Sequence, residues 1–205
     1  MSSLEAKTAS TAEPLGDGFF DRSVHEVAPE LIGCTLEVEG CAGVIVETEA
    51  YDRTDPACHA FVGRTARNEV LFGPPGRAYV YLSYGIHSLL NAVAEPEGSA
   101  AAVLIRALEP SAGIGLMRER RGRDGLRELC SGPGKLTEAL GVGLGMNGAR
   151  LDRPPLRVLA PAPGWEGVEV VAGPRIGITR AVDHPWRHCA AGNPFVSRPW
   201  PLTAR

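Results

Sequence analysis

The sequence predicts an α+β fold, built as one mixed domain from short strands and short helices. Hydrophobic side chains make up 44% of the 205 residues, which is enough to bury one substantial core. The 25 glycines and 17 prolines exceed ordinary usage and favour many turns between short strands over a helical bundle. Neither an internal repeat nor a linker interrupts the chain, so residues 19–205 are expected to form a single domain.

The first segment, residues 1–18, is expected to be a disordered tail, because small, polar and acidic side chains offer nothing to bury. It lacks the apolar centre of a signal peptide, and no later apolar run is long enough to span a bilayer. The five cysteines show no C-x-x-C spacing, which indicates reduced thiols rather than a disulfide framework or a zinc site. We therefore expect a soluble intracellular protein, cytoplasmic or associated with the nucleoid, that needs no metal.

The charge is unevenly distributed along the chain. The formal net charge of −3 excludes the uniformly basic body that is typical of a nonspecific nucleic-acid coat. Residues 1–50 carry two basic side chains against ten acidic ones, so the remainder of the chain is mildly basic.

The first element expected after the tail is a short packing helix over residues 21–32. Ser23 is a plausible N-cap, Pro29 a break or kink, and Gly33 a stop signal. A hairpin of strands 36–39 and 44–51 around a turn at 40–43 is expected next, followed by a polar loop over 52–76 and a second hairpin of strands 78–83 and 87–94. A strand over 101–107, a helix over 112–121 and a helix ending at 140 should follow. The C-terminal part is expected to form strands over 156–159, 168–171 and 175–179, and loops over 180–188 and 192–198.

The strand over 44–51 ends in two carboxylates and a phenol. Strand alternation places Glu47, Glu49 and Tyr51 on one face, together with Ile45. A carboxylate held near a half-buried apolar surface loses part of its hydration, which raises its pKa and suits it to proton transfer. The alternative is an ordinary strand end whose acids face water, since perturbed carboxylates mark functional sites only statistically.

A single arginine, Arg106, interrupts the near-continuous apolar strand over 101–107. An unpaired buried guanidinium is very costly, so we expect a carboxylate partner, with Glu47 or Glu49 as the candidates. The alternative is that Arg106 emerges into water at the end of its strand.

The second hairpin places a large ring, Tyr84, at its tip, where small polar residues are usual. Such a ring either packs on its own hairpin or enters another molecule. Tyr79 and Tyr81 share one face of the preceding strand, and Asn91 lies part-way along the return strand.

Two segments carry donors that suit phosphate groups. Arg64, Thr65 and Arg67 lie in the polar loop, where guanidinium and hydroxyl donors could grip a DNA backbone, although a merely solvated loop would look the same. Lys135 follows a Ser-Gly-Pro-Gly turn, but the spacing of a triphosphate loop is absent and Leu136 replaces its hydroxyl residue. The lysine at a helix start could still hold one backbone phosphate.

Taken together, these segments resemble the alkyladenine (3-methyladenine) DNA glycosylase family from about residue 19 to residue 198. The resemblance rests on the motifs Val46-Glu47-Thr48-Glu49-Ala50-Tyr51, His59, Tyr79-Val80-Tyr81-Leu82-Ser83-Tyr84-Gly85, Asn91, Arg106-Ala107-Leu108-Glu109-Pro110, Ser131-Gly132-Pro133-Gly134-Lys135-Leu136 and Gly192-Asn193-Pro194-Phe195-Val196-Ser197. It implies a mixed domain around a curved antiparallel sheet with flanking short helices. It also implies excision of alkylated purines without a cofactor.

The resemblance implies a role for each matching residue. Glu49 would activate a water with Arg106 beside it, Tyr51, His59 and Tyr81 would form the base pocket, Asn91 would guard that pocket, and Tyr84 would fill the gap in the duplex. Arg64, Thr65, Arg67 and Lys135 remain the candidate backbone contacts. The expected partner is double-stranded DNA with alkylated or deaminated purines, bound by a monomer that does not associate with membranes.

Two other classes of function remain open at the level of sequence. A noncatalytic module that binds damaged DNA would have no need of Glu49 with Arg106. A hydrolase of free nucleosides would have no need of Tyr84 at a tip, or of Arg64 and Arg67.

Overall fold

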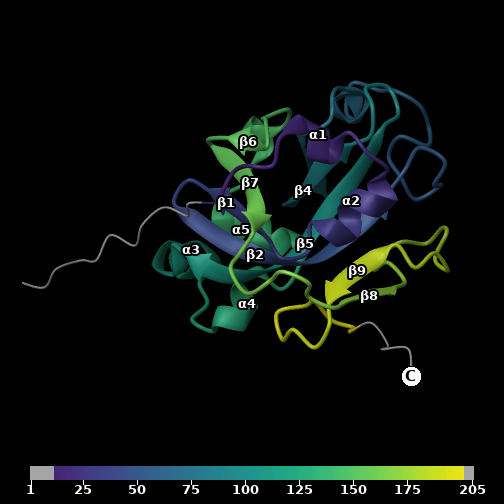
Figure 1. The fold of residues 1–205 in the computed structure, drawn as a ribbon. Helices are drawn as coiled ribbons and strands as arrows, with labels where there is room; N and C mark the ends of the chain where they lie inside the picture. Colours follow the sequence, from purple (N-terminus) through teal and green to yellow (C-terminus); the bar gives the residue numbers. More distant parts are fainter. Residues whose placement is uncertain (1–11, 201–205) are drawn as a thin grey trace, which may run out of the picture.

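A curled antiparallel sheet forms the centre of the protein (Figure 1). The structure is a computed structural model that describes residues 12–200. Within these residues the main path of the sheet runs β3-β4-β5-β2-β1-β7-β6, and β9 pairs with both β2 and β8. The strands are β1 (Cys34–Val38), β2 (Cys41–Tyr51), β3 (Ala78–Ser83), β4 (His87–Ala94), β5 (Ala101–Ala112), β6 (Asp152–Arg153), β7 (Leu156–Pro161), β8 (Val170–Gly173) and β9 (Arg187–Ala190).

Short helices flank the sheet, as the α+β prediction requires (Figure 1). They are α1 (Asp17–Phe20), α2 (Val24–Glu30), the 3₁₀ turn η1 (Glu69–Phe72), α3 (Ile114–Arg121), α4 (Leu126–Cys130), α5 (Pro133–Leu140) and the 3₁₀ turn η2 (Leu144–Met146). The curved antiparallel sheet and the short helices confirm the predicted fold class. No helix in the described part of the chain is long and apolar enough to cross a bilayer.

Side-chain alternation in β5 separates the main core from a second, smaller cluster. Val103 and Ile105 join the main core, whereas Ala102 joins the second cluster with Tyr79 and Leu71. Leu104 and Arg106 line a cavity on the same face as Ala102. One face of the central strand therefore stabilises the fold, and the other builds a site.

Two of the register shifts between β2 and β5 lie beside the charged residues Glu47 and Arg106. Glu47 pairs with Ala107 and Thr48 with Ile105, so the register shifts around Glu47 and Arg106. Because bulges bend a strand and re-aim its side chains, they provide a local reason why charged groups point into the site here.

The first predicted helix and hairpin are confirmed with shifted ends. α2 is shorter than 21–32, and the hydroxyl of Ser23 accepts a hydrogen bond from the amide of His25 at 3.4 Å, as an N-cap does. Strand β2 begins at Cys41, so the predicted turn over 40–43 is wrong. The turn lies at Glu39 and Gly40, which both have positive φ, the geometry that tight hairpins require.

The second hairpin has the predicted bounds, and the helix over 112–121 begins later because β5 extends to Ala112. Two predictions near the C-terminus are wrong. Residues 175–179 form no strand, since the Ile176 amide donates to a carboxylate instead of a ladder. Residues 187–190, expected partly within a loop, form β9, whose Cys189 pairs with Glu47 of β2.

The expected tail boundary at residue 18 is also too late. Pro14 bridges to Leu159, and α1 begins at Asp17. Residues 1–11 of the expected tail lie outside the described residues. All five cysteines are buried free thiols, in agreement with the reduced state expected from their spacing.

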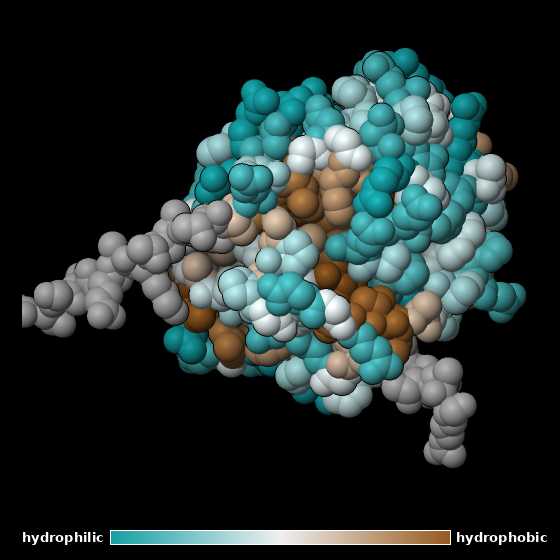
Figure 2. Space-filling model, in the orientation of Figure 1, coloured by the Kyte–Doolittle hydropathy of each residue, from teal (hydrophilic) through white to brown (hydrophobic). Residues whose placement is uncertain are grey.

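The face drawn in Figure 2 is mostly hydrophilic, with apolar side chains gathered near its middle and beside β9.

The described residues contain no group of three His, Cys, Asp or Glu side chains that could hold a metal ion.

Candidate active site

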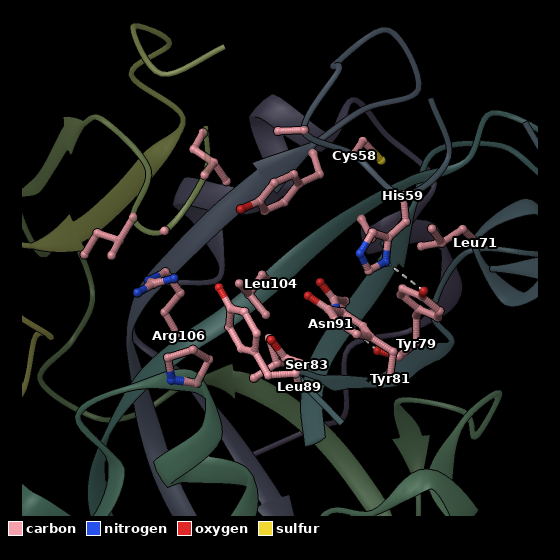
Figure 3. Close-up of a pocket in the computed structure, with 18 residues that line it drawn as sticks. Cys58, His59, Leu71, Tyr79, Tyr81, Ser83, Leu89, Asn91, Leu104 and Arg106 are labelled. Atoms are coloured by element: carbon pink, nitrogen blue, oxygen red, sulfur yellow. Dashed lines mark hydrogen bonds between the residues drawn. The ribbon is translucent and has the colours of Figure 1, made fainter. Parts of the chain in front are cut away.

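A cavity of about 380 Å³ opens between the β3–β4 hairpin, β5 and two loops (Figure 3). Arg106 lies at one end and His59 with Tyr79 at the other, while Asn91 and Leu104 lie between them. The loop after β2 contributes His59, and residues 176–178 close another wall. The cavity is therefore built from segments that are far apart in the sequence.

Arg106 connects the two carboxylates of β2. Its Nε donates to Oε1 of Glu47 at 2.9 Å, and its Nη1 lies 3.3 Å from Oε2 of Glu49. Both carboxylates are fully buried, and Arg106 is 6% exposed. The predicted partner of Arg106 is thus confirmed, and the alternative of an arginine that emerges into water is wrong.

Glu47 is held as a carboxylate by several donors. Arg187 Nε donates to its Oε1 at 2.7 Å, and the amide and hydroxyl of Ser197 donate at 2.7 and 2.8 Å. Burial raises the pKa of Glu47, but the guanidiniums of Arg106 and Arg187 and the two donors of Ser197 outweigh it, so the net pKa is lowered. Glu47 is therefore the counter-ion of two arginines, Arg106 and Arg187.

For Glu49, burial outweighs the groups that lower the pKa. Its Oε2 accepts from the Tyr51 hydroxyl and its Oε1 from the Ile176 amide, both at 2.8 Å. Burial raises the pKa of Glu49, and Arg106 with these two hydrogen bonds only partly opposes that effect. Two neighbouring carboxylates whose pKa values are driven apart are typical of an acid–base site.

Glu49 lies directly behind the wall of the cavity. Tyr51 and Arg106 line the cavity, and both contact the Oε2 of Glu49. The other oxygen, Oε1, receives the Ile176 amide as its one hydrogen bond from the described residues, which leaves capacity for a second donor. Oε1 of Glu49 could therefore accept one further hydrogen bond.

Aromatic rings form the far end of the cavity. The rings of Tyr79 and Tyr81 stack at 5.3 Å, and His59 meets Tyr81 edge-on at 4.5 Å. His59 Nδ1 lies 3.0 Å from the Tyr79 hydroxyl (Figure 3). Burial and the nearby Arg67 lower the pKa of His59, so its ring is neutral near neutral pH. Neutral rings suit a cationic ligand.

Asn91 is buried at the base of this pocket, where its Nδ2 donates to the Tyr79 carbonyl at 3.1 Å. Tyr84 lies at the hairpin tip with 91% of its surface exposed and a positive φ of 51°. The ring is not buried against its own hairpin, and it borders the mouth of the cavity.

Residues 18–194 match the family of methylpurine-DNA glycosylases. The chain belongs to this family. A protein of Rhodopseudomonas palustris (strain HaA2) is 60% identical over 191 residues, which cover 91% of this chain and 92% of that protein. A protein of Bradyrhizobium diazoefficiens is 57% identical, with 92% and 93% covered, and one of Nitrosospira multiformis is 54% identical, with 88% and 92% covered. Each carries the name "Putative 3-methyladenine DNA glycosylase".

The predicted backbone contacts of this methylpurine-DNA glycosylase family member are not gathered in one place. Arg64 is exposed and pairs with Glu69 at 2.7 Å. Arg67 donates to the Leu82 carbonyl at 3.0 Å and lies over the ring of Tyr81, which lines the cavity. Thr65 is engaged in a turn with Asn68. Lys135 lines a second cavity beyond Arg106.

Several site residues were missed at the sequence level. Arg187 and Ser197 hold Glu47, and the Ile176 amide holds Glu49. Tyr79 is part of the aromatic pocket, and its shared face with Tyr81 was the available signal.

A buried ion pair between Asp55 and Arg175 was also missed. Arg175 donates to both carboxylate oxygens of Asp55 and to the Ala50 carbonyl, and it lies over the Tyr51 ring at 4.5 Å. Both side chains of the pair are fully buried. Because Arg175 precedes Ile176, the pair fixes both the ring of Tyr51 and the amide that reaches Glu49. No local sequence pattern predicts the pairing of Asp55 with Arg175.

Proposed function

We propose that the protein is a monofunctional DNA glycosylase that removes alkylated purines from double-stranded DNA by hydrolysis of the N-glycosidic bond. The observation that carries the proposal is the arrangement of Glu49 and Arg106 beside a cavity that ends in aromatic rings. Membership in the methylpurine-DNA glycosylase family and the names of the relatives support the same activity. Deaminated purines are further candidate substrates of the same pocket, and the proposed active form is a monomer.

Base flipping is the first step. A base stacked in a duplex is out of reach, so the nucleotide must leave the stack at a cost of roughly a few kcal/mol. Tyr84 is exposed at a hairpin tip next to the cavity mouth, where its ring can fill the space that the base vacates. The free energy of stacking this ring in the duplex offsets part of the cost of flipping.

Recognition uses the charge of the damaged base. Alkylation of a ring nitrogen makes a purine cationic, and a cation over an aromatic face gains about 0.5–2 kcal/mol. Tyr51, His59 and Tyr81 line the cavity and supply such faces, and Asn91 at its base can reject purines with unsuitable edge groups. A neutral base does not gain this attraction to the aromatic rings.

The chemical step needs only a water and the buried carboxylate. The cationic base is already a good leaving group, so bond cleavage leaves positive charge on the sugar. Glu49 accepts a proton from the attacking water and opposes that charge, while Arg106 orients Glu49. The water oxygen forms the new bond to the sugar carbon, and the base departs with the electron pair of the glycosidic bond. No cofactor takes part in this step.

The product is an abasic site in an intact strand. Strand cleavage by a bifunctional enzyme needs an amine that attacks the sugar, and such a lysine must be desolvated or flanked by charge. The chain has only Lys7 and Lys135. Lys135 lines the second cavity rather than the base pocket, and Lys7 lies outside the described residues.

Incubation of the protein with an alkylated duplex, followed by alkali, tests the proposal. A glycosylase produces breaks only after alkali, heavy-oxygen water labels the sugar, and borohydride traps no covalent complex. A protein that binds the duplex without producing alkali-sensitive sites would be the noncatalytic module instead. Release of bases from free nucleosides but not from duplex DNA would support the nucleoside hydrolase.

A further inference from the structure

A second cavity, of about 550 Å³, lies against the base pocket and shares Arg106 with it. The start of α5 also borders both cavities, since Pro133 lines the base pocket whereas Gly132 and Lys135 line the second one. The remaining lining residues are Arg127, Glu128, Ser131, Val196, Ser197 and Arg198. The two cavities are thus adjacent compartments separated by one guanidinium and one helix end.

The lining of the second cavity is strongly cationic. Arg106, Arg127, Lys135 and Arg198 face a single carboxylate, that of Glu128. Arg106 is neutralised by Glu47 and Glu49, but within residues 12–200 no carboxylate forms an ion pair with the other three cations.

The guanidiniums of Arg127 and Arg198 lie over the ring of Trp200, at 5.3 and 5.5 Å. An aromatic face holds the position of a guanidinium while leaving its N–H donors free for another ligand. The hydroxyl of Ser131 adds a neutral donor to the same lining. The cavity therefore presents oriented positive charge and hydrogen-bond donors to an anion.

We propose that this cavity binds a phosphodiester of the DNA strand that carries the flipped nucleotide. The proposal rests on the proposed function, because it assigns the base of that nucleotide to the first cavity. A nucleotide whose base lies in the first cavity places its sugar beside Arg106, and the strand then continues past the wall that both cavities share. Arg127 and Arg198 match phosphate oxygens with paired N–H donors, and Lys135 contributes a point charge.

This site differs from the polar loop in its available charge. Arg64 is compensated by Glu69, and Arg67 already donates to the Leu82 carbonyl. Most of the binding energy for the damaged strand should therefore come from the α4–α5 side of the base pocket.

The experiment combines protein variants with DNA in which one phosphate at a time is neutral. Affinities are measured for the wild type, Arg127→Gln, Lys135→Gln and Arg198→Gln on a duplex with an abasic analogue. A methylphosphonate replaces each phosphate near the analogue in turn. Arg153→Gln is the matched control, because Arg153 is exposed on β6 and lines neither cavity.

We expect each of the three variants to lose about tenfold in affinity on ordinary DNA, as for a hydrogen bond to a charged group. Each should also reduce the dependence of log K on log salt by about one unit, whereas Arg153→Gln changes neither. At one linkage beside the analogue, the neutral phosphate should weaken the wild type, and the three variants should then lose nothing further.

The proposal is overturned if the three variants bind like Arg153→Gln, or if their losses multiply with that of the neutral linkage at every position tested. Thermal unfolding of each variant checks that the fold is retained. Excision by the wild type on alkylated DNA is measured in parallel. Its absence would refute the proposed function, whereas excision combined with purely multiplicative losses would refute the phosphate site alone.

Discussion

Arg106 Nη1 lies 3.3 Å from Oε2 of Glu49, a carboxylate that has no exposed surface. Burial raises the pKa of Glu49, and this contact opposes the rise because a nearby cation favours the charged form of an acid. The balance leaves the pKa of Glu49 above its ordinary value. A carboxylate whose pKa is raised takes a proton from water more readily once it is ionised.

The raised pKa of Glu49 predicts the shape of the pH profile. A base works only when ionised, so single-turnover excision should rise with pH and level off above a pKa that exceeds the ordinary value of 4.5. Arg106→Gln removes the cation, so the rise should move to higher pH and the plateau should fall. A profile with an unchanged midpoint in Arg106→Gln would show that the arginine does not set this pKa.

The pKa of Glu47 is lowered, whereas that of Glu49 is raised, and this lowered pKa makes the stability of the fold depend on pH. Because the pKa of Glu47 is lowered in the folded protein, its contribution is complete above the unfolded pKa and is lost as pH falls through the folded pKa. Glu47→Gln leaves Arg106 and Arg187 without this partner and should cost about 3–5 kcal/mol in the free energy of unfolding at neutral pH.

Denaturant titrations of wild type and Glu47→Gln across pH measure this effect. The difference between the two proteins should shrink as the pH is lowered, because protonation then removes the same charge from the wild type. A difference that stays constant with pH would mean that Glu47 acts through packing rather than charge.

The buried pair of Asp55 and Arg175 should be essential to the cavity wall. Arg175→Met leaves the Asp55 carboxylate buried without its cation and should destabilise the protein by about 3–5 kcal/mol. The double variant Asp55→Asn with Arg175→Met should recover part of this loss, since the uncompensated charge is gone. Excision should stay reduced in the double variant, because the Ile176 amide and the Tyr51 ring lose their support. Full activity in the double variant would show that the pair is only structural.

Tyr84 should matter most where flipping is costly. Tyr84→Ala is expected to slow single-turnover excision most for bases in stable pairs and least for bases that are mispaired or in single strands. Tyr84→Phe, which keeps the ring, should remain close to the wild type. A uniform loss across all opposite bases would indicate that the ring serves its own hairpin and not the duplex.

Local patterns predicted much of this molecule, and the reasons are visible in particular elements. The β3–β4 hairpin follows directly from alternating apolar residues around a turn, so its bounds and the exposed place of Tyr84 could be predicted. Arg106 could be assigned a carboxylate partner because a charge within an apolar strand needs one.

The supporting contacts could not be predicted in the same way. Arg187 and Ser197 reach Glu47 across 140 and 150 residues of sequence, and nothing near Glu47 specifies them. Strand β9 reads Arg-His-Cys-Ala and lacks the alternation of a strand, because its pairing with β2 is set by the fold. The apolar residues Ile176 and Ile178 imitate a strand, yet they line the cavity.

The most direct measurement is single-turnover excision by Glu49→Gln on an alkylated duplex, together with its affinity for the same DNA. The amide keeps the shape of the side chain but can neither accept the proton of the water nor oppose positive charge on the sugar. We predict nearly unchanged affinity and a loss of excision of about 10²–10⁴-fold, as for removal of a general base. Retention of more than about a tenth of the wild-type rate would contradict the account, because that loss is far smaller than removal of the base should cause, and it would point to Glu47 or another group as the base.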